Sequence, residues 1–124
     1  MSRRFCSLGI LTLATLCASG LAAAGNPDKG RELFATCAAC HTPGQGAVTP
    51  GPDLRGLIGR QAGTVPGFRY SRAMKNSKIV WSDATLDAYL ENPQTYIPGN
   101  AMPFPGLPEP KERQELIAYL QTLK

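Results

Sequence analysis

The chain contains the stretch Cys37-Ala38-Ala39-Cys40-His41, in which two cysteines three residues apart are followed directly by a histidine. Positions i and i+3 of a helical turn face the same side, so both thiols can reach one porphyrin edge. Each thiol can form a thioether with a vinyl group, and the adjacent histidine can offer a ring nitrogen to the iron. The stretch therefore predicts covalent attachment of one haem c through Cys37 and Cys40, with His41 as an iron ligand.

Three other uses of these residues have less support in the sequence. A structural zinc site needs four ligands, often as two separated pairs, but the chain has only one histidine and two of its four cysteines lie in the N-terminal apolar stretch. A thioredoxin-like Cys-x-x-Cys lies near a βαβ pattern, and the sequence shows no strand runs. A disulfide between Cys37 and Cys40 would close only a very small loop.

Residues 1–24 have the pattern of a secretory signal peptide. Arg3 and Arg4 precede 20 uncharged residues that end in Leu21-Ala22-Ala23-Ala24, a small-residue cleavage site. An uncleaved membrane anchor is the alternative, because about 20 residues can span a bilayer. Cleavage leaves residues 25–124 as a domain of 124 − 24 = 100 residues. Export predicts an oxidising compartment, the bacterial periplasm.

The composition of this domain predicts a small, loop-rich, all-α fold. All 11 prolines and 11 of the 13 glycines follow residue 24, so much of the chain forms turns and its side-chain core is limited. A bound haem would supply the missing apolar bulk. Without the two signal-peptide arginines, 11 Lys and Arg face nine Asp and Glu, a net charge of +2. No basic stripe interleaved with aromatic residues is present, so nucleic acid binding is not expected.

Four helices are expected from caps and apolar spacing. The first covers residues 26–40, with Asn26 as its cap, and a short one lies within residues 64–81. Ser82 caps a third helix over residues 83–91, where Trp81 and Leu86 can form a hydrophobic staple. The last covers residues 110–123, and its apolar stripe should pack on Leu33 and Phe34. Residues 42–58 and 96–106 are rich in Pro and Gly and are expected to form loops.

A second iron ligand must come from a residue other than histidine. The expected domain has two methionines, Met74 and Met102. Met102 lies in a proline-stiffened loop that can hold a soft sulfur at the iron, whereas Met74 lies in a polar stretch that suits a surface position. Met102 is therefore the predicted sixth ligand, and a His/Met pair raises the reduction potential.

Further stretches complete a pattern that covers most of residues 30–120. They are Gly51-Pro52-Asp53-Leu54-Arg55-Gly56-Leu57-Ile58-Gly59-Arg60, Pro66-Gly67-Phe68-Arg69-Tyr70, Tyr89-Leu90-Glu91-Asn92-Pro93, Tyr96-Ile97-Pro98-Gly99, Met102-Pro103-Phe104-Pro105-Gly106 and Leu116-Ile117-Ala118-Tyr119-Leu120. Together with the attachment stretch, they resemble class I cytochrome c of the mitochondrial cytochrome c and bacterial cytochrome c2 type. The resemblance implies the class I cytochrome c fold, wrapped around one haem.

The resemblance also implies individual roles around the iron. His41 and Met102 are similar to the family's axial ligands, and Pro52 matches the proline whose carbonyl accepts a hydrogen bond from the proximal histidine. Tyr89 matches the tyrosine beside the methionine sulfur, and Phe104 the aromatic residue that shields the haem edge.

The resemblance also implies which residues bond the haem propionates and which residues pack where the terminal helices cross. Arg60, Tyr70 and Trp81 match the residues that bond the propionates. The residues that resemble the packed crossing of the terminal helices are Gly30, Phe34, Leu116 and Tyr119.

The sequence departs from the family pattern at several positions. Phe34 is one residue closer to Cys37 than expected, Asn100 replaces a threonine near the methionine loop, and Met74 replaces a polar amide. The lysines that ring the haem edge in mitochondrial proteins are largely absent, their places being taken by Thr36, Gln94, Thr95 and Ala101. Weakly charged, short-lived docking is therefore expected.

The sequence therefore predicts a soluble periplasmic monohaem cytochrome that carries single electrons and is not an enzyme. Its expected partners are transient redox proteins, a cytochrome bc1-type donor and a terminal oxidase or reductase acceptor, with the carrier itself a monomer. One alternative is an electron-transfer subunit of a larger periplasmic oxidoreductase. A peroxidase or gas-binding haem protein would instead need an open or labile sixth position.

Overall fold

The computed structural model describes residues 24–44 and 49–124, so the expected signal peptide lies almost wholly outside the described residues. The described residues contain five helices joined by loops. Among these residues, the one β-bridge joins Gln61 to Val80 and is not part of a sheet. The expectation of an all-α domain is confirmed. Within these ranges, no helix is long and apolar enough to cross a membrane. The helices are α1 (Pro27–Ala38), α2 (Arg72–Asn76), α3 (Asp83–Glu91), α4 (Pro93–Tyr96) and α5 (Pro110–Leu120).

Helix α1 begins as its sequence predicts. The Asn26 side chain accepts a hydrogen bond from the Asp28 amide at 2.9 Å, and Pro27 occupies the first helical position, where its missing N–H costs nothing. The helix ends at Ala38, two residues before the predicted end. It is one continuous helix through Phe34 and Cys37, so their shorter spacing causes no break in it.

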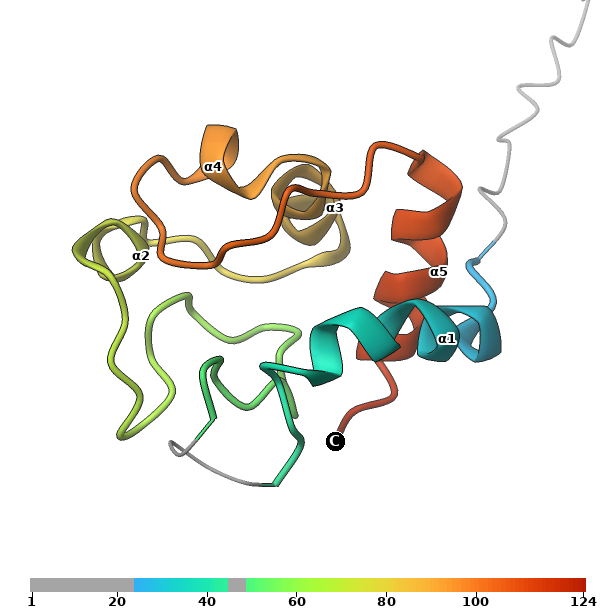
Figure 1. Cartoon of the computed structure of the whole chain (residues 1–124), viewed down its shortest axis with the longest axis horizontal. Helices are drawn as coiled ribbons and strands as arrows, with labels where there is room; N and C mark the ends of the chain where they lie inside the picture. Colours follow the sequence, from blue (N-terminus) through green and yellow to red (C-terminus); the bar gives the residue numbers. More distant parts are fainter. Residues whose placement is uncertain (1–23, 45–48) are drawn as a thin grey trace, which may run out of the picture.

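Helices α1 and α5 cross closely at one side of the molecule (Figure 1). Phe34 packs on Tyr119 with ring centroids 5.1 Å apart, as the apolar stripe of the last helix predicts. A Cβ on Gly30 would lie 1.9 Å from the carbonyl oxygen of Glu115, so the two backbones can approach only because this residue is glycine. Helix α5 ends at Leu120, three residues before the predicted end, and tightens into a turn.

Helix α3 has the bounds that its cap predicts. The Ser82 hydroxyl accepts from the Thr85 amide, and the Thr85 hydroxyl accepts from the Ser82 amide in return, so both free N–H groups are satisfied. Trp81 and Leu86, the expected staple pair, are both buried in the same core cluster. The capped helix thus turns its buried face, including Tyr89, towards the centre of the fold.

Two short helices flank this region. Helix α4 was not predicted, although its signal is the dipeptide Asn92-Pro93, in which the Asn92 side chain accepts from the Thr95 amide and Pro93 is the first helical residue. Helix α2 is the short helix expected within residues 64–81. The surface position predicted for Met74 is wrong, because this side chain is half-buried and packs against the core.

Candidate haem site

The attachment stretch lies where α1 ends. Cys37 is in the last turn of the helix, and the amides of Cys40 and His41 both donate to its carbonyl oxygen, at 3.0 and 2.9 Å. This turn keeps the two cysteines and the histidine together. Both thiols are free and half-buried, so no disulfide joins them. Burial, and secondarily the neighbouring Cys40, raises the pKa of the Cys37 thiol.

The imidazole of His41 is oriented by one backbone carbonyl. Its Nδ1 lies 2.8 Å from the carbonyl oxygen of Pro52, which can only accept, so Nδ1 carries the proton. Burial lowers the pKa of His41, against the opposing effect of this hydrogen bond, and thus favours the neutral ring. Neutral His41 therefore keeps the Nε2 lone pair for a metal. The imidazole can lie this close to the backbone only because residue 51 is glycine, since a Cβ on Gly51 would lie 2.6 Å from the His41 ring.

A network of hydrogen bonds holds the loop that carries Met102. Asn100, only 6% exposed, accepts from the Met102 amide at 2.9 Å and donates to the carbonyl oxygens of Pro93 and Ile97 at 2.8 and 3.0 Å. Gln94 donates to the carbonyl oxygens of Asn100 and Met102. Asn100, which stands where the family pattern has a threonine, thus fixes the backbone of this loop through its side chain.

Tyr89 is next to the methionine sulfur, as the resemblance implies. Its hydroxyl donates to Met102 Sδ at 3.8 Å, with Asn100 Oδ1 at 3.4 Å as a second acceptor. Its ring packs on Trp81 with centroids 5.1 Å apart. Burial raises the pKa of Tyr89 to about 12, so the hydroxyl stays protonated and able to donate at neutral pH.

The three residues expected at the propionates lie in one connected region. The Trp81 amide donates to the Arg60 carbonyl at 2.9 Å. The guanidinium of Arg60 donates hydrogen bonds to the carbonyl oxygens of Arg55 and Asp53 at 2.8 and 2.9 Å. Burial raises the pKa of Tyr70, and the positive charge of Arg60 opposes this rise. The Tyr70 hydroxyl accepts from the Val65 amide, which leaves its own proton to donate.

The donor set and its surroundings fit a covalently attached haem. Two free thiols, an imidazole with an available Nε2 and a thioether sulfur are the groups that a c-type haem requires. Several apolar side chains that pack against the core are only half-buried. These side chains are Leu33, Leu54, Ala73, Met74, Ile79, Phe104 and Leu107.

Two polar side chains are structurally more important than the sequence pattern indicated. Asn100 and Gln94 were noted only as departures from a family pattern, although together they make five hydrogen bonds to backbone groups around the methionine loop. For Asn100 the available signal is an amide side chain within a Pro-rich loop, because such a loop has few backbone partners of its own.

Comparison with known proteins gives one consistent family. The cytochrome c family profile matches residues 27–124. Cytochrome c from Sesamum indicum is 52% identical over 99 residues, which cover 78% of this chain and 89% of that protein. Cytochrome c2 from Rhodopila globiformis is 46% identical over 106 residues, 85% of this chain and all of that protein. The structure of cytochrome cH from Methylobacterium extorquens aligns with a TM-score of 0.75 and 39% identity, covering 79% of this chain and 99% of that one.

Proposed function

The chain belongs to the cytochrome c family, and from this premise we propose that it shuttles single electrons between periplasmic redox partners through a haem ligated by His41 and Met102. Family membership establishes the class I cytochrome c fold, one haem c bound covalently through Cys37 and Cys40, and the class of monohaem electron carrier. The axial ligand pair, the compartment and the partners are the proposal. The observation that carries it is the firmly held methionine loop.

The bound haem supplies an iron that cycles between Fe(II) and Fe(III) by one electron. The residues of the chain keep the surroundings the same in both states. Pro52 fixes the orientation and tautomer of His41, while Asn100 and Tyr89 hold the Met102 backbone and sulfur. Ligands that are held by their own hydrogen bonds need little rearrangement when the charge of the iron changes, and this favours fast electron transfer.

Further residues are assigned to the periphery of the haem. Arg60, Tyr70 and Trp81 are proposed to hold the propionates, which need charged or hydrogen-bonding partners when they leave water. The hydrogen bond from the Trp81 amide to the Arg60 carbonyl, next to the Gln61–Val80 bridge, supports this role for Arg60 and Trp81. Phe104 is proposed to shield the haem edge, because it is half-buried two residues after Met102 and packs against the core.

Partners and compartment are proposed from the sequence pattern together with the relatives. Residues 1–24 would direct export to the periplasm and be removed there. The carrier, as a monomer, would accept electrons from a cytochrome bc1-type donor and deliver them to a terminal oxidase or reductase through small transient interfaces. The relatives named cytochrome c2 support a role of this kind.

The test is an optical redox titration of the haem-loaded protein, repeated under carbon monoxide, with Met102→Ala as the comparison. We expect one reversible one-electron wave at positive potential, a methionine-to-iron band in the oxidised form and no carbon monoxide shift. Met102→Ala should lose the band and bind carbon monoxide when reduced. Ready carbon monoxide binding by the unaltered protein would contradict the proposal and favour peroxidase or gas-binding chemistry.

A further inference from the structure

Arg113, early in α5, is a buried cation that does not belong to the residues around the iron. Its side chain is only 5% exposed. A guanidinium that leaves water is costly in free energy unless its charge is paired and its N–H groups find acceptors. Here the acceptors are one carboxylate on α3 and two backbone carbonyls that precede α5. These partners show which segments the side chain holds together.

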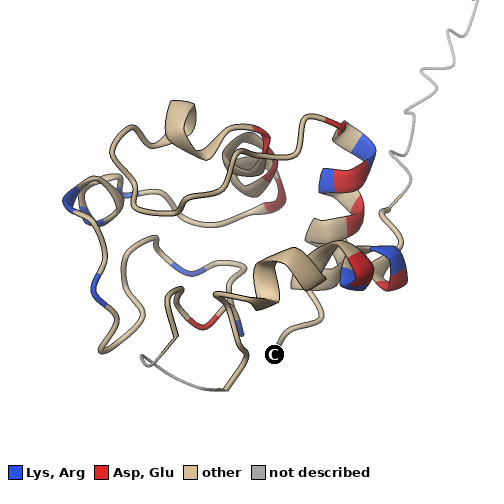
Figure 2. Cartoon of the chain, in the orientation of Figure 1, with Lys and Arg blue, Asp and Glu red and all other residues tan. Residues whose placement is uncertain are grey.

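Helix α3 supplies the negative charge that pairs with Arg113. The charged residues of this helix are all acidic (Figure 2), and Asp83, Asp87 and Glu91 are spaced four apart, on one side of it. Like charges at this spacing destabilise a helix. Arg113 Nε donates to Asp87 Oδ1 at 2.7 Å, and Nη1 lies 3.9 Å from Glu91 Oε1. In the part of the chain that the structure describes, no other ion pair reaches α3.

The other partners of Arg113 lie in the segment that leads from the methionine loop into α5. Arg113 Nη1 donates to the carbonyl oxygens of Leu107 and Pro108, both at 2.8 Å. The Leu107 amide donates in turn to the Leu90 carbonyl at 2.7 Å. The guanidinium therefore joins α3, α5 and this segment at one point. Throughout the described ranges, no other hydrogen bond joins α5 to residues 103–108.

The segment between Met102 and this point is held by hydrogen bonds only at its ends. Within residues 103–106, the one hydrogen bond that the described structure contains runs from the Phe104 amide to the Met102 carbonyl, at 2.9 Å, and stays inside the loop. Pro103 and Pro105 fix the backbone φ angle at two of these four positions. A short, stiff segment transmits a displacement of one end to the other, so release of its downstream end would also shift Met102.

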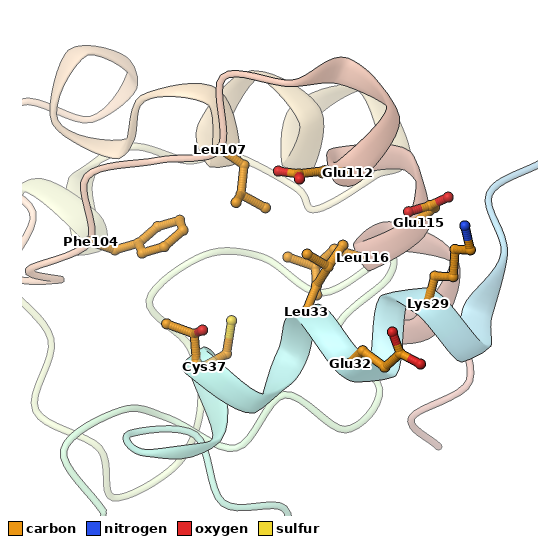
Figure 3. Close-up of a pocket in the computed structure, with 10 residues that line it drawn as sticks. Lys29, Glu32, Leu33, Cys37, Phe104, Leu107, Glu112, Glu115 and Leu116 are labelled. Atoms are coloured by element: carbon orange, nitrogen blue, oxygen red, sulfur yellow. The ribbon is translucent and has the colours of Figure 1, made fainter.

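The same segment forms part of the wall beside the haem attachment. Phe104 and Leu107 line a cavity of about 410 Å³ together with Leu33 and Cys37, and Figure 3 shows their side chains pointing into it. Leu107 thus has its side chain in the cavity while its carbonyl accepts from Arg113. Release of that carbonyl would loosen the wall and the methionine loop together.

We propose that Arg113 is a positioning residue for the sixth iron ligand, because it ties the segment after Met102 to α3 and α5 and so opposes release of the methionine sulfur. The inference rests on the proposed electron-carrier function, in which Met102 is that ligand. The role requires arginine, since one planar guanidinium can donate to a carboxylate and to two carbonyls at once, whereas a lysine ammonium has a single nitrogen. Docking of α5 thereby becomes a condition for firm ligation by Met102.

The test measures the rate at which carbon monoxide binds to the reduced, haem-loaded full chain, because carbon monoxide can bind only after Met102 leaves the iron. Arg113→Met removes all four hydrogen bonds of the guanidinium and should raise the rate about tenfold or more, the factor that one hydrogen bond from a charged donor contributes. Arg113→Lys keeps the charge and should give an intermediate rate. Asp87→Asn removes only the paired charge, at a half-buried position, and tests the tie even if Arg113→Met does not fold.

The matched control is Gln121→Ala. Gln121 Nε2 donates to Asp83 Oδ1 at 2.7 Å, so this change also removes a side-chain hydrogen bond to α3 but leaves the segment before α5 untouched. It should alter the carbon monoxide rate by less than about twofold. The second readout is hydrogen exchange of the Leu107 amide in the oxidised protein, which should accelerate in the Arg113 and Asp87 variants and stay unchanged in Gln121→Ala.

The outcomes distinguish this inference from the carrier proposal. Equal carbon monoxide rates in Arg113→Lys, Asp87→Asn and Gln121→Ala would overturn the positioning role and leave the carrier function intact. Faster exchange at Leu107 without faster carbon monoxide binding would overturn it as well, because the tie would then not act on the ligand. If the unaltered protein already binds carbon monoxide readily, ligation by Met102 fails, and the carrier proposal with it.

Discussion

Replacing Asn100 by alanine should loosen the methionine loop more than any other single change to a polar side chain there. The change removes the hydrogen bonds to the Pro93 and Ile97 carbonyls and to the Met102 amide, which are 2.8, 3.0 and 2.9 Å long. The Pro93 carbonyl still accepts a hydrogen bond from the Ile97 amide, and the Ile97 carbonyl still accepts one from the amide of residue 100. The Met102 amide loses the acceptor that the structure gives it.

The magnitude follows from these partners. Three hydrogen bonds at about 1 kcal/mol each, together with one poorly satisfied N–H, predict a loss of about 2–4 kcal/mol in the free energy of unfolding. Asn100→Thr should lose only about 1 kcal/mol, because a hydroxyl can still accept from the Met102 amide. Asn76→Ala is the matched control, since Asn76 is exposed at the end of α2, and should change stability by less than about 0.5 kcal/mol.

The assay is guanidinium unfolding of the oxidised, haem-loaded protein, followed by the methionine-to-iron band and by tryptophan fluorescence. In Asn100→Ala the band should disappear at lower denaturant than the global unfolding seen by fluorescence. Its reduced form should bind carbon monoxide faster than that of Asn76→Ala. Equal midpoints and equal carbon monoxide rates in the two variants would refute the assignment of Asn100 as the residue that holds the loop.

Three other substitutions test separate parts of the structure. Gly30→Ala places a Cβ 1.9 Å from the Glu115 carbonyl, so α1 and α5 must separate, and the free energy of unfolding should fall by about 3 kcal/mol in a denaturant titration. The hydrogen bonds from Arg55 lower the pKa of Asp53 from 3.8 to about 2. The ionised Asp53 carboxylate therefore stabilises the folded protein fully above pH 3.8, and this contribution is lost as the pH falls towards 2. Asp53→Asn should therefore lose less stability than the unaltered protein over that interval in acid unfolding curves. Tyr89→Phe removes a hydrogen bond that withdraws electron density from the methionine sulfur, so the reduction potential should fall in a redox titration, and an unchanged potential would contradict this contact.

The sequence predicts those elements of the fold that depend on local chemistry. Asn26 and Ser82 cap the helices that they were expected to cap, because the cap bond forms within three residues. Helix α4 has the same kind of signal in Asn92, but its four residues bury too little apolar surface to give a periodic pattern. The C-terminal ends of α1 and α5 differ by two or three residues from expectation, because no glycine or proline marks them.

The parts that escape the sequence depend on contacts between distant segments. Gln94 reaches the carbonyl oxygens of Asn100 and Met102 only because α4 turns the chain back on itself. Met74 occupies a polar stretch, yet the path of the chain around α2 turns it towards the core. The burial of Glu115 likewise follows from the approach of two helices, which no pattern within α5 encodes.

The crossing of α1 with α5 also constrains when the fold can close. Helix α1 is synthesised early, whereas α5, on which it packs, follows three intervening helices in the chain. The face of α1 that is buried in the folded protein therefore stays exposed until α5 is available. Cys37 belongs to the last turn of that waiting helix. After export, the Cys37 thiol is therefore expected to stay accessible for haem attachment until α5 packs on α1.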